Sequence, residues 1–61
     1  MQLTFGDIDI GQEFEQPETN EHMAKFVKLP HNKAKSLETM QVFHFENHWV
    51  IWLFENANYQ E

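Results

Sequence analysis

Three side chains that can bind metal ions lie close together in the segment His-Phe-Glu-Asn-His, residues 44–48. In an extended strand His44 and Glu46 share a face about 7 Å apart, and a turn would bring His48 back towards them. Zinc needs three or four converging ligands, so His22 or His31 would have to join from elsewhere in the chain. This spacing matches no established metal motif, so we expect exposed histidines and no cofactor. The sequence leaves open whether His44, Glu46 and His48 bind a metal ion.

Residues for catalysis are sparse. Ser36 is the only serine, and it lies in a lysine-rich strand with no base predicted beside it. The chain has no cysteine and no glycine-rich phosphate loop. The carboxylate pairs of 7–9 and 13–15 are expected in polar, turn-like surroundings, where no burial raises a pKa for general-acid work. Short chains also rarely enclose a pocket of about 300 Å³ or more, so we predict that the protein is not an enzyme.

The charge balance disfavours nucleic acid as a direct partner. Ten acids face four lysines in 61 residues, which gives a net charge of −6, and the chain has no arginine. A negative protein is repelled by phosphate backbones, and the bidentate fork that reads guanine is absent from this sequence. Stacking of single-stranded nucleic acid on aromatic residues near the lysines is a weaker alternative.

The same composition predicts one small soluble domain over residues 1–61, with residues 55–61 as a frayed tail. No apolar run approaches the roughly 20 residues of a membrane helix, and the first residues lack the pattern of a signal peptide. We therefore expect no membrane association. The absence of cysteine fits a reducing compartment, so we expect a cytoplasmic protein, in the host-cell cytoplasm if it is phage-encoded.

Residue patterns typical of β-strands dominate the sequence. A strand at 23–29 is followed by the Pro-His-Asn turn 30–32 and a return strand at 33–37. Further strands are predicted at 40–45 and 49–54, joined by a turn at 46–48. These connections of two to four residues favour an antiparallel meander, and no apolar stripe of helical period is long enough for a substantial helix.

The N-terminal segment 4–14 is expected to add core residues and a compact turn. Gly6 and Gly11 bracket a turn or a single helical turn, and the residues from 15 to 21 are predicted to form a polar loop. The candidate core residues in this segment are Phe5, Ile8, Ile10 and Phe14. The fold class is therefore all-β: a small antiparallel meander of four to five strands, curved or closed as an SH3-like barrel, with little or no helix.

Three motifs carry a resemblance: Phe-Gly-Asp-Ile-x-Ile-Gly-x-x-Phe at 5–14, Phe-Val-Lys-Leu at 26–29 and Ala-x-x-Leu at 34–37. Together they resemble a group of short uncharacterised bacterial and phage β-proteins. The resemblance covers most of the chain and implies a small curved sheet or SH3-like barrel. It implies no catalytic or binding residues, and the tryptophan-rich last strand here departs from the acidic ending that is usual in the group.

The last predicted strand is apolar on both faces. Trp49, Ile51 and Leu53 alternate with Val50, Trp52 and Phe54, so neither set is polar. A chain of this size has room for about one core, and the second set needs a cover. Barrel closure by the 5–14 segment, a second copy of the chain, or a foreign partner could supply it.

The aromatic surplus near the C-terminus predicts the contact surface. Large aromatic residues dominate interface hot spots, so we expect a non-enzymatic module that binds a protein partner or itself, as a homodimer or higher homo-oligomer. The surface is predicted as one face of the last hairpin, either Phe43, Phe45, Trp52 and Phe54 or the opposite face with Trp49. The predicted contact residues are Phe43, Phe45, Trp49, Trp52 and Phe54.

An alternative function follows from charge. All four lysines fall between positions 25 and 35, so a basic hairpin separates two acidic segments. The lysines can neutralise neighbouring acids and protect strand edges, or contact an anion at the hairpin tip. The acids can instead form the working surface of a phage-type inhibitor that mimics nucleic acid and occupies a basic groove on a nucleic-acid-binding complex.

Overall fold

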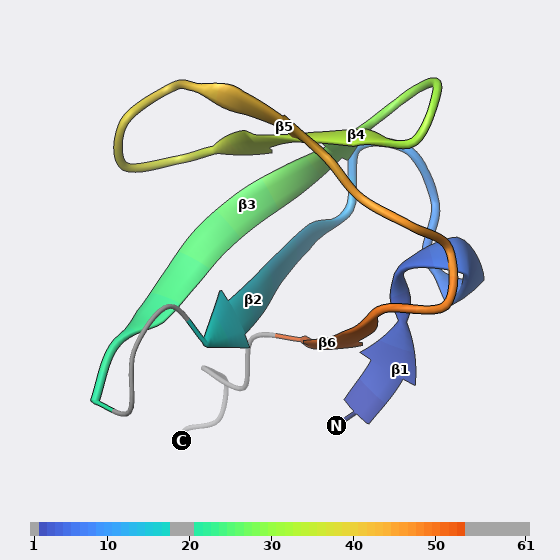
Figure 1. The fold of residues 1–61 in the computed structure, drawn as a ribbon, viewed down its shortest axis with the longest axis horizontal. Helices are drawn as coiled ribbons and strands as arrows, with labels where there is room; N and C mark the ends of the chain where they lie inside the picture. The colour runs from blue at the N-terminus through green and yellow to red at the C-terminus, as the bar shows by residue number, and fades with distance from the viewer. Residues whose placement is uncertain (1, 18–20, 54–61) are drawn as a thin grey trace, which may run out of the picture.

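Six antiparallel strands form one sheet in the order β1-β6-β2-β3-β4-β5 (Figure 1). The computed structural model describes residues 2–17 and 21–53 of the chain. The strands are β1 Gln2–Thr4, β2 Glu13–Pro17, β3 Met23–Leu29, β4 Lys33–Ser36, β5 Val42–His44 and β6 Val50–Trp52. The 3₁₀ turn η1, Phe5–Asp7, is the one helical element within these ranges. The all-β prediction is therefore confirmed.

The sheet is curved and open. In Figure 1, β2 and β3 run through the middle, with β4 and β5 folded to one side and β6 and β1 to the other. The two edge strands of the described sheet, β1 and β5, do not pair with each other. The curved-sheet prediction therefore holds, whereas the barrel does not close. The sheet has six strands, whereas four to five were predicted.

The central hairpin follows the sequence prediction closely. β3 and β4 pair from Phe26↔Ser36 to Leu29↔Lys33, across the predicted turn at 30–32. His31 and Asn32 have φ values of 65° and 59°, the left-handed region in which Asn is one of the few well-tolerated residues. Asn32 thus lets the chain reverse within three residues.

The predicted C-terminal hairpin is wrong. β6 pairs with β1 over Gln2↔Trp52 to Thr4↔Val50 and meets β2 at Glu15↔Trp52, whereas β5 pairs with β4. Residues 46–49 do form the predicted turn, closed by a hydrogen bond of 3.1 Å from Trp49 N to Glu46 O. The turn does not join β5 to β6 as a hairpin, because backbone hydrogen bonds tie residues 45 and 49 to other parts of the chain. Phe45 N donates to Asn32 O at 2.9 Å, and Phe5 N donates to Trp49 O at 2.8 Å. The segment therefore crosses the open side of the sheet and places β6 between β1 and β2.

The polar loop predicted at 15–21 begins later, because β2 continues to Pro17. Alternation explains the extra length: Phe14 is fully buried, while Glu13 and Glu15 on either side face away from it and lie opposite Val27 and Lys25 of β3. Ile10 is a second correction. It is 63% exposed rather than buried, because it lies in the turn that precedes β2.

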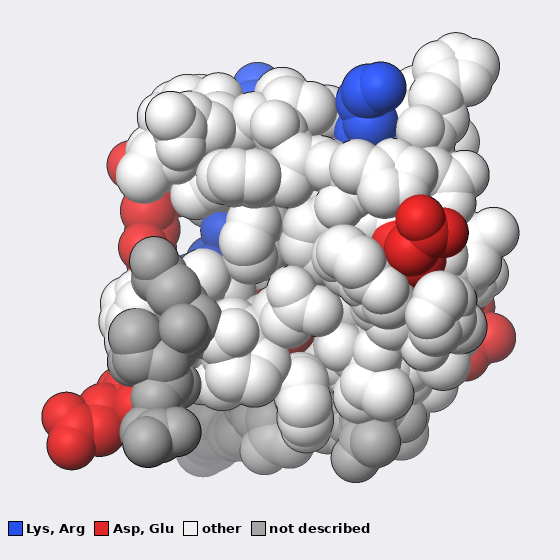
Figure 2. Space-filling model, in the orientation of Figure 1, with Lys and Arg blue, Asp and Glu red and all other residues white. Residues whose placement is uncertain are grey.

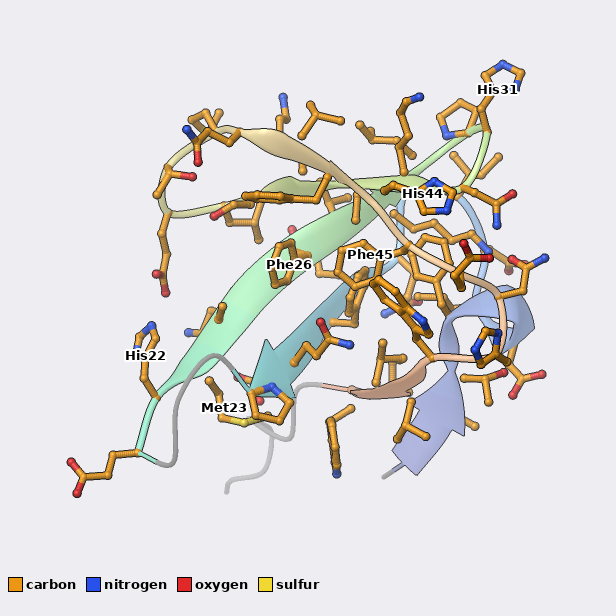
Figure 3. All side chains as sticks on the ribbon, in the orientation of Figure 1. His22, Met23, Phe26, His31, His44 and Phe45 are labelled. Atoms are coloured by element: carbon orange, nitrogen blue, oxygen red, sulfur yellow. The ribbon has the colours of Figure 1, made fainter. Side chains whose placement is uncertain are left out.

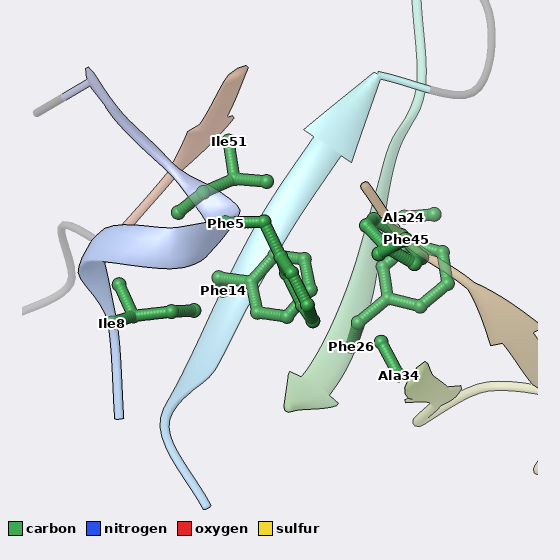
Figure 4. Packing of buried hydrophobic residues seen from close by; sticks show 8 residues of the cluster. All are labelled: Phe5, Ile8, Phe14, Ala24, Phe26, Ala34, Phe45 and Ile51. Carbon is green, nitrogen blue, oxygen red and sulfur yellow. The ribbon is translucent and has the colours of Figure 1, made fainter. Parts of the chain in front are cut away.

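The core is built mainly from phenylalanine rings (Figure 4). Phe5, Phe14 and Phe45 form edge and tilted contacts with ring centroids 5.0–5.6 Å apart, a favourable range for aromatic pairs. Phe26 stacks on Phe14 at 5.6 Å, and Ile51 closes one end of the cluster. The buried apolar residues are Phe5, Ile8, Phe14, Ala24, Phe26, Ala34, Phe45 and Ile51.

The two faces of β6 differ in burial. Ile51 is fully buried and Leu53 packs against the core, so this face belongs to the interior. Val50 faces the other way and is 37% exposed, and Trp52 beside it is half-buried. The 5–14 segment does not cover this second face, because Phe5 and Ile8 pack on the core side with Ile51.

Candidate functional site

An open groove lies on the concave side of the sheet, between β5 and the ends of β2 and β3. Its volume is about 430 Å³, and Figure 2 shows a hollow in a largely uncharged surface below β5. Phe26 and Ala24 form an apolar floor, and Phe43 and Trp49 stand at its rim. We call this site the aromatic groove. Its lining residues are Gln16, Pro17, Ala24, Phe26, Ser36, Glu38, Thr39, Gln41, Phe43, His44, Phe45 and Trp49.

The predicted contact residues fall into different places. Phe43 and Trp49 are 43% and 37% exposed, and both line the aromatic groove. Phe45 is only 2% exposed and belongs to the core, where Figure 3 shows it beside Phe26. Trp52 is half-buried on the opposite face of the sheet, and Phe54 lies outside the described residues. The structure therefore joins Phe43 with Trp49, a pair that the hairpin prediction had placed on opposite faces.

Phe45 leaves almost no surface for a partner, because its ring is packed among the other aromatic residues of the core. Its centroid lies 5.0 Å from Phe5, 5.2 Å from Phe26 and 5.3 Å from Trp49. The Phe45 ring therefore packs directly against the indole of Trp49. Phe43 packs edge-on to Phe26 at 6.0 Å and leaves the rest of its ring in solvent.

The backbone that carries Trp49 is fixed at both ends. Asn32 Nδ2 donates to Phe45 O at 3.2 Å and to Asn47 Oδ1 at 3.0 Å. At the other end Phe5 N donates to Trp49 O at 2.8 Å. Between them Gly6 N donates to Asn47 O at 2.9 Å, and a Cβ on Gly6 would lie 3.1 Å from the Asn47 side chain. This close approach explains a glycine at position 6. Trp49 is therefore held in place by the β3–β4 turn and by η1.

Ser36 shapes the other wall of the groove. It is 5% exposed, and its Oγ accepts hydrogen bonds from Glu38 N and Thr39 N, both at 3.2 Å. These bonds stabilise the β4–β5 connection, in which Met40 adopts a φ of 67°. The only serine thus has a structural task, and no histidine bonds to it among the described residues.

The histidines are spread over the molecule. Figure 3 shows His22 and His31 at opposite ends, with His44 near β5. His44 Nε2 lies 2.8 Å from Glu46 Oε2, as expected for residues that share a strand face, and His22 Nε2 lies 3.3 Å from Glu38 Oε1. No group of three or more His, Cys, Asp or Glu side chains converges within residues 2–17 and 21–53.

Asp7 is the last residue of η1. Its Oδ2 accepts hydrogen bonds from Thr4 Oγ1 at 2.8 Å and from Thr4 N at 3.1 Å. The side-chain bond, followed by the backbone bond, lowers the pKa of the Asp7 carboxyl below its ordinary value. A carboxylate held ionised at the surface is a poor general acid, and its task here is to cap η1.

Sequence reasoning missed the polar lining of the groove and the residues that hold it. Gln16 could have been found, because alternation along 13–17 puts it on the same face as Phe14. The turn cluster Pro-His-Asn did mark Asn32 as a turn residue. Its hydrogen bond to Asn47 could not be predicted, because no local sequence pattern shows that residues 45–49 pass next to this turn.

Comparisons with known proteins add nothing to these observations. No family model, no curated protein and no solved structure matches this chain. Among the described residues, no helix has the length and apolar character that a membrane crossing requires. The resemblance to short bacterial and phage β-proteins therefore remains a prediction from the sequence.

Proposed function

We propose that this protein is a small non-enzymatic module that binds a partner protein through the aromatic groove. One observation carries the proposal: Phe43 and Trp49 flank an apolar cavity of about 430 Å³ and keep 43% and 37% of their surface exposed. Such a volume falls in the range of sites that accept large apolar groups. Exposed aromatic residues beside a groove are typical anchors of protein interfaces.

The groove is also rigid enough to act as a binding surface. Trp49 rests on Phe45, Asn32 and Gly6 hold the backbone that precedes it, and Phe5 N donates to the Trp49 carbonyl. A preformed site loses little conformational entropy when a partner binds, so more of the contact energy is retained as affinity.

Charge gives weaker support to the acidic-inhibitor alternative. On the outer face Glu15 lies directly opposite Lys25, and Glu13 lies opposite Val27, whose other neighbour is Lys35. Acidic and basic side chains therefore alternate across β2, β3 and β4. A continuous acidic surface, which a nucleic-acid mimic needs, does not form on this part of the sheet.

The test is a selection of short random peptides displayed on phage, with the folded protein as the target. Peptides enriched on the wild type should bind the Trp49→Ala variant at least tenfold more weakly, because a hot-spot tryptophan would be lost. Trp52→Ala is the matched control, since Trp52 is half-buried on the opposite face. The proposal is wrong if enriched peptides bind Trp49→Ala as well as they bind the wild type.

A further inference from the structure

The outer edge of β5 carries backbone groups to which no strand of residues 2–17 and 21–53 is paired. Ser36 N donates to Gln41 O at 2.8 Å, and Phe45 N donates to Asn32 O at 2.9 Å. Alternation in an antiparallel ladder therefore turns the amide and carbonyl of Phe43 towards β4. The amides and carbonyls of Val42 and His44, between these positions, point away from the sheet.

The other edge of the sheet is closed at the corresponding place. On β1 the bond from Phe5 N to Trp49 O turns the backbone of Thr4 outward. There the Thr4 amide is already bonded to Asp7 Oδ2, and η1 begins at the next residue. Val42, in contrast, is 51% exposed and is followed by no cap. The β5 edge is thus the more receptive of the two.

The side chains around this edge specify what can pair with it. Phe43 faces the aromatic groove, whereas Val42 and His44 alternate with it along β5 and lie in register with Lys35 and Lys33, with His44 also at the border of the groove. Neither lysine has an ion pair within the described ranges. Glu46 lies beside this edge, where its carboxylate is bonded to His44.

We propose that β5 accepts an extended segment of a partner protein as an additional strand, with apolar side chains facing the aromatic groove and acidic side chains on the sheet face that carries Lys33 and Lys35. The inference rests on the proposed function and names the form and chemistry of the partner. The backbone of the segment bonds to Val42 and His44, while its inward side chains pass Phe43 into the groove. The net charge of −6 opposes an acidic segment only weakly at physiological salt, because charges farther than about 8 Å are screened.

A second copy of this chain fits the edge less well. If two β5 strands paired about a twofold axis, Val42 would pair with His44 of the other copy and the two Phe43 rings would meet. Phe43 would then be the single inward side chain of each added strand, and most of the cavity of about 430 Å³ would stay unfilled. A strand of three residues also falls far short of the roughly 1,200 Å² that stable interfaces bury.

Two capped peptides, Glu-Val-Glu-Phe-Glu-Val-Glu and its counterpart with Lys in place of Glu, provide the test. Each is titrated into ¹⁵N-labelled protein while the backbone amides are followed by NMR. The acidic peptide should shift the amides of Val42 and His44 and bind at least tenfold more tightly than the basic one. Equal affinities, or shifts that spare both amides, would overturn the proposal.

Val42→Pro removes the outward amide without touching the ladder to β4, and proline is tolerated on edge strands. It should weaken binding of the acidic peptide about tenfold, whereas Val42→Thr, which keeps the amide and the branched shape, should leave binding within twofold. If Trp49→Ala weakens binding and Val42→Pro does not, strand addition is wrong and the aromatic groove remains the binding surface. A dimer in analytical ultracentrifugation that Val42→Pro dissociates would assign the edge to a second copy and refute the proposal.

Discussion

Lys28 differs from the other lysines because its charge serves the interior. Its Nζ donates to Phe5 O at 2.9 Å and to Ile8 O at 2.8 Å, and it lies 4.6 Å from the centroid of the Phe5 ring. The sequence predicted that lysines neutralise acids at the surface or protect edges. Strand alternation did indicate that Lys28 and Lys25 face opposite sides of the sheet. The carbonyls to which Lys28 donates belong to residues 23 and 20 positions earlier in the chain, so no local pattern could identify them.

Replacing Lys28 with methionine should lower the free energy of unfolding by about 1.5–3 kcal/mol, because two half-buried carbonyls lose a charged donor. Urea denaturation followed by circular dichroism measures the change. Lys33→Met is the matched control, since the Lys33 side chain is exposed and forms no hydrogen bond or ion pair with the described residues, and it should stay within about 0.5 kcal/mol of the wild type. Equal effects of the two substitutions would contradict the role assigned to Lys28.

Asp7 predicts how part of the stability depends on pH. Hydrogen bonds from Thr4 lower the pKa of its carboxyl below the ordinary value of 3.8, so the contribution is fully present above that value and is lost as pH falls through the lower, folded-state pKa. Asp7→Asn should be less stable than the wild type at neutral pH, and this difference should shrink in strong acid. Thermal denaturation at a series of pH values tests it, and a difference that stays constant would refute it.

At the scale of elements, residues 45–49 determine the topology. Asn32 holds this segment through its own carbonyl and through two side-chain hydrogen bonds, so β6 cannot fold back on β5. Asn32→Gly keeps the left-handed backbone accessible and removes the side-chain bonds. We expect a loss of about 1–2 kcal/mol in unfolding free energy and faster hydrogen exchange at the Phe45 amide. Unchanged exchange at Phe45 would show that the clamp is unnecessary.

Local patterns predicted the elements that depend on local chemistry. β3 matches the predicted strand 23–29 residue for residue, and the turn at 30–32 contains the left-handed Asn32. The partner of β6 could not be predicted, because strand pairing depends on where the 45–49 segment is anchored. β2 was missed as a strand because Pro17 and the acids of 13–17 are typical of loops, although Phe14 alternates with them.

For the molecule as a whole, the phenylalanine cluster limits what the chain can tolerate. A domain of this length has about 3–9 kcal/mol of stability, and truncating a buried phenylalanine costs about 3–5 kcal/mol. Phe45→Ala should therefore leave much of the protein unfolded at 25 °C, seen as collapsed dispersion in an amide NMR spectrum. A well-dispersed spectrum with intact stability would show that Phe45 is not part of the core.

The aromatic count indicated the right region but not the right surface. The sequence placed five aromatic residues between positions 43 and 54, and three of them line the aromatic groove, of which Phe43 and Trp49 are exposed and Phe45 is buried. It could not separate them from Phe45, because burial of a residue at a strand end depends on the curvature of the whole sheet. The short length of the chain also disfavoured an enclosed pocket of this size. The observed site is an open groove, which a short chain can form without surrounding it on all sides.

The affinity of Phe43→Ala for peptides selected on the wild-type protein, measured beside its free energy of unfolding, tests the central claim most directly. Phe43 is 43% exposed at the groove rim, so the variant should keep its stability within about 1 kcal/mol. Its affinity should fall at least tenfold, because an exposed anchor beside the cavity is lost. Unchanged affinity in this folded variant would contradict the assignment of the aromatic groove as the surface that binds a partner protein.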